Sequence, residues 1–160
     1  MKEGTQINRM KSIKKTLLFC AIVMTLATCK KTSLKGDYFI FGSSYGECSG
    51  SCVNYYLLKK GNLYSDDMSL STKRLKFKND KLPSGKADLA NHLKAQLPTF
   101  LKNSSSERFG CPDCHDQGAY FIELSEDGIT KSFHLDTDTG AVPIELRTFV
   151  VNIESTLRQL

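Results

Sequence analysis

The chain has 160 residues, no tryptophan and a formal net charge of +5. Residues 1–28 hold five Lys or Arg residues and one Glu, so residues 29–160 carry a net charge of only about +1. Most of the basic excess therefore belongs to residues 1–28, and this near-neutral balance argues against a nucleic-acid-binding protein. A segment of 132 residues after position 28 suits one domain.

The N-terminus has the pattern of an export signal. A basic stretch with Lys11, Lys14 and Lys15 precedes an apolar run from Leu17 to Leu26. That run is shorter than a bilayer-spanning helix requires. We therefore predict a signal segment over residues 1–28.

The signal ends in Leu26-Ala27-Thr28-Cys29, which resembles the lipobox of bacterial lipoproteins. The resemblance implies that Cys29 is lipidated after the preceding residues are removed. The lysines that follow, Lys30 and Lys31, resemble an outer-membrane sorting signal. A plain secretory signal is the alternative. Residues 29–36 would then form a lipidated cysteine and a short tether, and residues 37–160 one domain.

Strand and turn signals follow the tether. Tyr38 to Phe41 and Val53 to Leu58 are rich in strand-forming residues, and residues 59–62 supply a turn into Leu63-Tyr64. The basic stretch from Lys73 to Lys81 is expected to be a solvated strand or loop. Ser84 to Leu101 has a helical pattern, with Ser84 as its cap and Pro98 as its break.

A hairpin is predicted over Ala119 to Asp136, with Asp127-Gly128 as its turn. This register sets Ile122 opposite Phe133 and Tyr120 opposite Leu135 on one apolar face. The other face receives six further side chains: Phe121, Glu123, Ser125, Thr130, Ser132 and His134.

The chain ends in a predicted helix over Pro143 to Leu160. Its apolar stripe comprises Leu146, Val150, Ile153, Leu157 and Leu160. Hairpins interrupted and followed by helices predict an α+β domain, in which an antiparallel sheet carries two helices packed on one face.

Four cysteines remain once Cys20 is removed and Cys29 is lipidated; they are Cys48, Cys52, Cys111 and Cys114. An even number in an exported chain favours two disulfides, with three possible connectivities. Pairing between the two distant loops would close about sixty residues and stabilise the fold by about 3–4 kcal/mol. The same four residues could instead bind zinc, with His115 as a substitute ligand.

Residues 111–115 also match the C-x-x-C-H pattern of haem attachment and the C-x-x-C pattern of a redox dithiol. Neither context fits, because residues 103–110 are predicted as a loop and a hairpin begins shortly after the motif. The exported location favours disulfides over these alternatives.

Other catalytic patterns are absent from the sequence. The histidines His92, His115 and His134 form no metal-binding or catalytic motif, and no nucleophile elbow or Walker loop occurs. Asp136 to Gly140 has the spacing of the start of a calcium loop, but Arg147 occupies the position of the closing Glu, so we predict a turn there.

Three stretches are similar to a group of small Bacteroidetes lipoproteins: residues 41–67, residues 109–124 and the final helix. The resemblance implies an envelope location and a single compact domain, and it carries over no catalytic residue. We therefore expect a non-catalytic binding or structural module without a cofactor, anchored to the membrane by lipid. Its partner would be a protein, glycan or small molecule. A zinc-binding or thiol-redox envelope protein is the alternative.

Overall fold

The computed structural model describes residues 34–46, 52–67 and 75–160. The chain divides into two compact units, Met1–Leu34 and Lys35–Leu160, and almost all described residues belong to the second. The predicted signal segment, Cys29 and Cys48 therefore lie outside the described residues. Among the helices of the described part, none has the length and apolarity needed to cross a bilayer.

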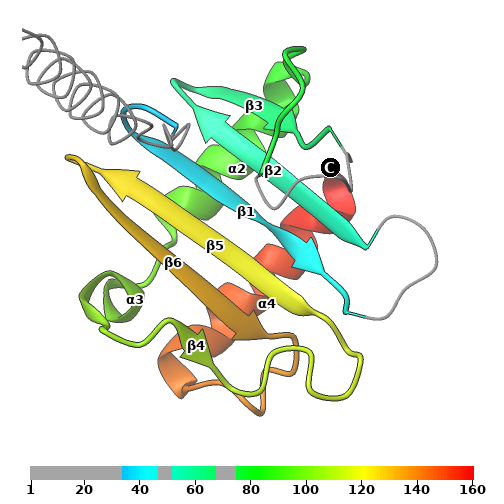
Figure 1. Cartoon of the computed structure of the whole chain (residues 1–160), viewed down its shortest axis with the longest axis vertical. Coiled ribbons are helices and arrows are strands. Elements are labelled where there is room, and N and C mark those ends of the chain that lie inside the picture. The colour runs from blue at the N-terminus through cyan, green and yellow to red at the C-terminus, as the bar shows by residue number, and fades with distance from the viewer. Residues whose placement is uncertain (1–33, 47–51, 68–74) are drawn as a thin grey trace, which may run out of the picture. The chain divides into compact units, whose positions relative to one another are not determined.

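Six strands form one sheet in the order β3-β2-β1-β5-β6-β4 (Figure 1). In chain order the strands are β1 (Tyr38–Ser44), β2 (Val53–Lys59), β3 (Asn62–Ser65), β4 (Arg108–Phe109), β5 (Ala119–Glu126) and β6 (Ile129–Asp136). Neighbours are antiparallel except β4, which runs parallel to β6. The predicted α+β class is confirmed.

The β5–β6 hairpin has the predicted register. Ile122 pairs with Phe133 and Tyr120 with Leu135. Asp127 and Gly128 form its turn with φ values of 52° and 78°, which is the left-handed backbone that a two-residue hairpin turn requires. The alternating pattern alone was sufficient here because a shift of one residue would expose every apolar side chain.

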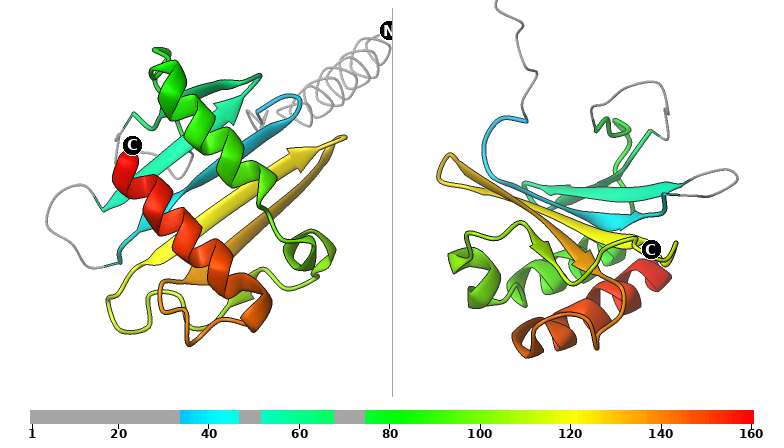
Figure 2. Two further views of the ribbon diagram at one scale, coloured as in Figure 1. Left: turned by 180° about the vertical axis from the view of Figure 1, so that it is seen from behind. Right: turned by 60° about the horizontal axis from the view of Figure 1, so that its bottom comes forward.

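Three α-helices accompany the sheet in the described residues: α2 (Ser84–Ala95), α3 (Thr99–Asn103) and α4 (Ile144–Gln159). Figure 2 shows α2 and α4 crossing the same face of the sheet. The core fills the space between them and includes Phe39 and Phe41, whose rings stack 5.4 Å apart. Leu93 of α2 and Ile153 of α4 are buried against this layer.

The predicted break at Pro98 is confirmed, but the helical pattern over Ser84 to Leu101 differs from the prediction after the break and at its cap. Pro98 divides it, so α2 ends at Ala95 and the separate α3 begins at Thr99. Proline lacks an N–H donor and disfavours helical backbone in the residue before it. Ser84 does not cap α2 either, because Pro83 occupies the cap position and no side chain bonds there.

Residues 103–110 were predicted as a loop, but Arg108 and Phe109 form the short strand β4 on the edge of β6. The backbone N–H of His134 donates to Glu107 O over 2.8 Å at the start of this pairing. Two residues carry too little periodicity to be recognised in a sequence.

The sheet has two ends with different contents. At one end, which we call the turn end, lie the N-terminus of β1 and the turns at Lys60-Gly61 and Asp127-Gly128. At the other, which we call the cysteine end, Ser44 of β1 pairs with Val53 and with Ala119. Cys52 directly precedes Val53, and the loop that contains Cys111 and Cys114 leads into Ala119.

Candidate functional site

Both cysteine-bearing loops meet at the cysteine end. The backbone N–H of Tyr45 donates to Cys52 O over 2.9 Å, which joins the end of β1 to the start of β2. A Cβ atom added at Gly118 would lie 2.5 Å from the Tyr45 ring and 2.9 Å from Ser44 O. The backbone of Gly118 also has a φ of +79°. Glycine at position 118 therefore allows the second loop to pack directly on the first.

Cys111 and Cys114 form a disulfide with their Cα atoms 5.5 Å apart. Both residues are exposed. Cys52 is also disulfide-bonded, and since Cys111 and Cys114 pair with each other, its partner is outside the described residues. The predicted disulfide is thus present at the second pair, and bridges from it to the first pair are excluded.

The Asp136 carboxylate organises the loop over residues 110–118. Oδ2 accepts the backbone N–H of Cys111 over 2.8 Å, and Oδ1 accepts that of Asp138 over 2.9 Å. The Gln117 amide donates to the same carboxylate over 3.4 Å and to Cys111 O over 3.1 Å. Asp136 is 2% exposed, so these donors supply the polar partners that a buried carboxylate needs.

This environment changes the acidity of Asp136. Burial by itself raises the pKa of a carboxyl group, but the backbone N–H groups of Asp138 and Cys111 and the Gln117 amide outweigh it. The pKa of Asp136 is therefore lowered, and the group is ionised at neutral pH. Asp138, the second carboxylate of the calcium-like stretch, accepts Gly140 N–H over 2.8 Å in a turn, as predicted.

Three rings form a row across the sheet face opposite the helices. Tyr55 of β2 lies 5.3 Å from Phe121 of β5, and Phe121 lies 5.3 Å from His134 of β6. All three are half-buried. We call them the aromatic row.

Gly42 makes this row continuous. It pairs with Tyr55 on one side and Phe121 on the other. A Cβ atom at position 42 would meet the Tyr55 ring at 2.5 Å, so the ring occupies the space of the missing side chain. The aromatic row thereby bridges β1, which contributes no ring of its own to it.

The row ends at a cation beside the cysteine loop. Arg108 of β4 pairs with His134, is exposed, and donates from Nη2 to Pro112 O over 3.4 Å. Burial and then the Arg108 charge lower the pKa of His134, while Glu107 opposes them. His134 is therefore a neutral ring at neutral pH, and Arg108 is the cation at this end.

A hydrogen-bonded carboxylate lies beside the aromatic row on the same face. Glu123 accepts the Tyr38 hydroxyl over 2.8 Å at Oε1 and the Ser132 hydroxyl over 2.9 Å at Oε2. Burial and then the Glu123 interaction raise the pKa of Tyr38, so its hydroxyl stays a donor. The face therefore offers aromatic surface, an anionic hydrogen-bonded group and a cation.

The other predicted candidates are not brought together. His92 lies on α2, where Nε2 is 2.8 Å from the Gln96 amide, and His115 is exposed in the cysteine loop. In residues 34–46, 52–67 and 75–160, no group of three His, Cys, Asp or Glu side chains is placed to hold a metal ion. A zinc site at the second cysteine pair would need thiolates, and there the sulfurs are bonded to each other.

Sequence reasoning placed Phe121 and His134 on one strand face but missed Tyr55, Gly42 and Arg108. The alternation within Val53 to Leu58 could have assigned Tyr55 to that face. The strand order that sets Tyr55 beside Phe121 has no local signal.

The fold and this face define a class, an α+β domain with helices on one sheet face and an aromatic row on the other. No protein-family model matches the chain, and no curated protein shows significant sequence similarity to it.

Proposed function

We propose that this protein is a lipid-anchored component of the cell envelope, held at the outer membrane through Cys29. In this proposal the domain is a non-catalytic binding or structural module stabilised by disulfides. The aromatic row and Arg108 form its binding surface for a protein, glycan or small molecule.

The anchor is supported by the sequence. The basic stretch, short apolar run and Leu26-Ala27-Thr28-Cys29 ending together match a lipoprotein signal. Acyl chains on one cysteine give durable attachment, because each buried methylene contributes about 0.8 kcal/mol.

The binding role is carried by one observation, the half-buried aromatic row that ends at exposed Arg108. Rings with partly exposed surface provide apolar contact area to a ligand, and a neighbouring guanidinium can fix an acidic or carbonyl group. These are the components of a recognition surface, and they require no bond-making chemistry.

The surroundings of the Cys111–Cys114 disulfide support a structural role for it. The loop carries Asp113 and Asp116 and is folded onto the Asp136 carboxylate. Negative charges disfavour a thiolate, the species that thiol exchange and zinc binding both use. Alkylation of exported protein should therefore modify none of the four cysteines before reduction, and labelling of Cys111 or Cys114 would favour the zinc or redox alternative.

The anchor is tested by growing cells that express the chain with an alkyne-bearing fatty acid. The wild type should incorporate the label and sediment with membranes. Cys29→Ser should do neither, with Cys20→Ser as the matched control that keeps the label. Equal labelling of wild type and Cys29→Ser would contradict lipidation at this residue.

The binding surface is tested with a panel of envelope glycans, peptides and metabolites followed by ligand-observed NMR. For any compound that binds, the Arg108→Gln/His134→Gln double variant should weaken affinity at least about tenfold, the loss expected when a charged and a ring contact are removed. Arg158→Gln is the control, because Arg158 pairs with Glu154 on the solvent side of α4, on the sheet face opposite the aromatic row (Figure 2). Equal affinity of the double variant and wild type would exclude the row as the site.

A further inference from the structure

We infer that the turn end is a second membrane contact, which places this end of the domain on an anionic bilayer and directs the cysteine end away from it. The inference rests on the proposed anchor at Cys29.

The chain enters the domain at the turn end. Lys35 follows Cys29 by six residues, which reach about 21 Å when fully extended. Tyr38 then begins β1 and pairs with Ser125, close to the β5–β6 turn. The Asp127 N–H donates to Asp37 over 3.2 Å, so this turn is held beside the entering chain.

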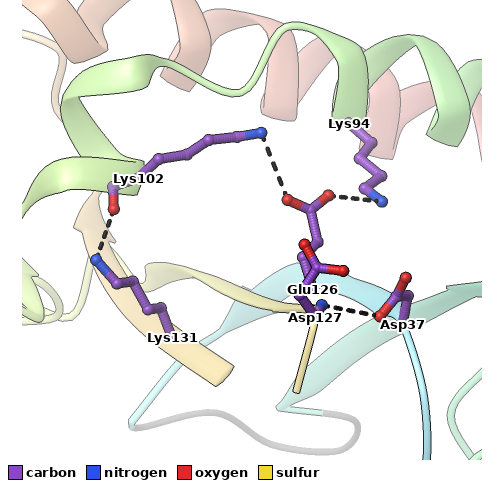
Figure 3. A network of polar contacts seen from close by, with 6 residues as sticks. All are labelled: Asp37, Lys94, Lys102, Glu126, Asp127 and Lys131. Carbon is purple, nitrogen blue, oxygen red and sulfur yellow. Dashed lines mark hydrogen bonds and ion pairs between the residues drawn. The ribbon is translucent and has the colours of Figure 1, made fainter. Parts of the chain in front are cut away.

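Positive charge exceeds negative charge at this end. Among the described residues, its lysines are Lys35, Lys59, Lys60, Lys94, Lys102 and Lys131, and its carboxylates are Asp37, Glu126 and Asp127. Figure 3 shows the Glu126 carboxylate between two lysines, 3.0 Å from Lys94 Nζ and 3.6 Å from Lys102 Nζ. Lys131 donates instead to Lys102 O over 2.5 Å. Lys94 and Lys102 thus share the Glu126 carboxylate, and the ammonium group of Lys131 bonds to a backbone carbonyl.

The cysteine end has the opposite sign. Its described carboxylates are Glu107, Asp113, Asp116, Asp136 and Asp138, whereas its cations are Arg108 and Arg147, which donates to Val142 O. An anionic surface attracts the turn end and repels this one, which favours a single orientation.

An apolar side chain also projects at the turn end. Ile129, the residue after the β5–β6 turn, is 67% exposed. A single exposed Ile is ordinary on a soluble surface. When the lysines of the turn end contact a bilayer, however, the Ile129 side chain can enter the interfacial layer, as the apolar residues of membrane-surface segments do.

The attraction of the turn-end lysines to an anionic bilayer only has to orient a domain that its tether already holds at the membrane; it does not have to recruit the domain from solution. A lysine near an anionic bilayer contributes about a fivefold preference. The tether confines the domain to the surface, which converts this contact into an intramolecular equilibrium. The contact should weaken as salt rises, because these charges are exposed and screened.

The test uses lipidated protein reconstituted into vesicles of phosphatidylcholine, with or without phosphatidylglycerol, and measures the acetylation rate of each lysine by mass spectrometry. Lys35, Lys59 and Lys60 should react at least about threefold more slowly on anionic vesicles, an effect set by their attraction to the surface. Lys76 and Lys78, which are exposed beside β3 and Asp67, serve as internal controls and should react equally on both. High salt should remove the difference.

Charge variants give the matched comparison. In Lys59→Gln/Lys60→Asn, where Asn tolerates the φ of 50° at position 60, Lys35 should regain its rate on anionic vesicles. Lys76→Gln/Lys78→Gln should leave the Lys35 protection intact. Equal rates for Lys59 and Lys60 on both vesicle types, in protein that co-sediments with them, would overturn the inference and leave the anchor standing. Protein that does not co-sediment would reject the anchor and the orientation together.

Discussion

At the scale of single residues, Asp136 connects the sheet to the cysteine loop. Its carboxylate accepts backbone N–H groups from Cys111, 25 residues earlier, and from Asp138 in its own turn. A buried carboxylate with several donors is costly to alter, because a changed partner leaves the donors unsatisfied.

Asp136→Asn tests this role. The amide keeps one acceptor oxygen but presents an NH₂ group toward a donor, so the free energy of unfolding should fall by about 2 kcal/mol. Urea denaturation of the variant and the wild type measures the difference. Asp138→Asn, at the exposed partner carboxylate, is the control and should cost clearly less.

The same residue predicts a pH dependence. Its pKa is lower in the folded protein than in the unfolded chain, so its contribution is fully present above about pH 4 and is lost as pH falls through the folded-state value. Wild-type protein should lose stability below pH 4 more steeply than Asp136→Asn. Parallel stability curves for the two proteins from pH 6 to pH 3 would show that Asp136 makes no such contribution.

At the scale of elements, the local disulfide changes the expected energetics of the fold. Pairing of Cys111 with Cys114 closes a loop of four residues, whereas a bridge to the first pair would have closed about sixty. The short loop constrains the unfolded chain less.

Cys111→Ser/Cys114→Ser should therefore lower the free energy of unfolding by about 2 kcal/mol, below the value for a long bridge. Thermal unfolding of exported wild type and variant gives the measurement. A loss above about 4 kcal/mol would indicate that the disulfide does more than close its own turn.

The close approach of β1 to the Tyr55 ring gives a second prediction at this scale. A methyl group at Gly42 would overlap the ring and backbone of Tyr55, so Gly42→Ala should destabilise the fold by about 1–3 kcal/mol. Gly85→Ala is the matched control. Gly85 has open space around it in the first turn of α2, and alanine there should be neutral or stabilising by up to about 1 kcal/mol. Similar melting temperatures for the two variants would contradict the proposed packing.

At the scale of the whole molecule, the domain over Lys35–Leu160 has its own core. Side chains of β1, β2, β3, β5 and β6 pack with α2 and α4 in one hydrophobic cluster. A shared core couples the elements, so they should unfold together.

A fragment of residues 35–160, prepared under oxidising conditions, should unfold in one cooperative transition. Scanning calorimetry should yield equal calorimetric and van't Hoff enthalpies. Two transitions would contradict a shared core, and a broad transition without a heat-absorption peak would show that the fragment has no packed core of its own.

Much of the fold could be predicted from the sequence because its signals are local. The β5–β6 register follows from alternation around Asp127-Gly128, and the stripe of Leu146, Val150 and Ile153 identified the buried face of α4. Pro98 also indicated where the first helical pattern stops. It did not indicate that a separate helix, α3, begins after it.

The candidate site could not be predicted in this way, because its residues are far apart in the sequence and meet only in the folded sheet. Tyr55 and Phe121 are 66 residues apart and meet because β1 lies between their strands with a glycine at the crossing point. Arg108 joins them through a parallel strand of two residues. The disulfide connectivity was equally open in the sequence, since spacing permits both local and crossed pairing.

By itself, the sequence determined the α+β class, the β5–β6 register and the apolar face of α4, because side-chain periodicity decides which face of an element can be buried. Only the tertiary structure decided which strands are neighbours, that Cys111 bonds to Cys114, and that basic and acidic groups collect at opposite ends of the sheet. Those features depend on strand order, which arises from the packing of the whole core and leaves no mark within any one segment.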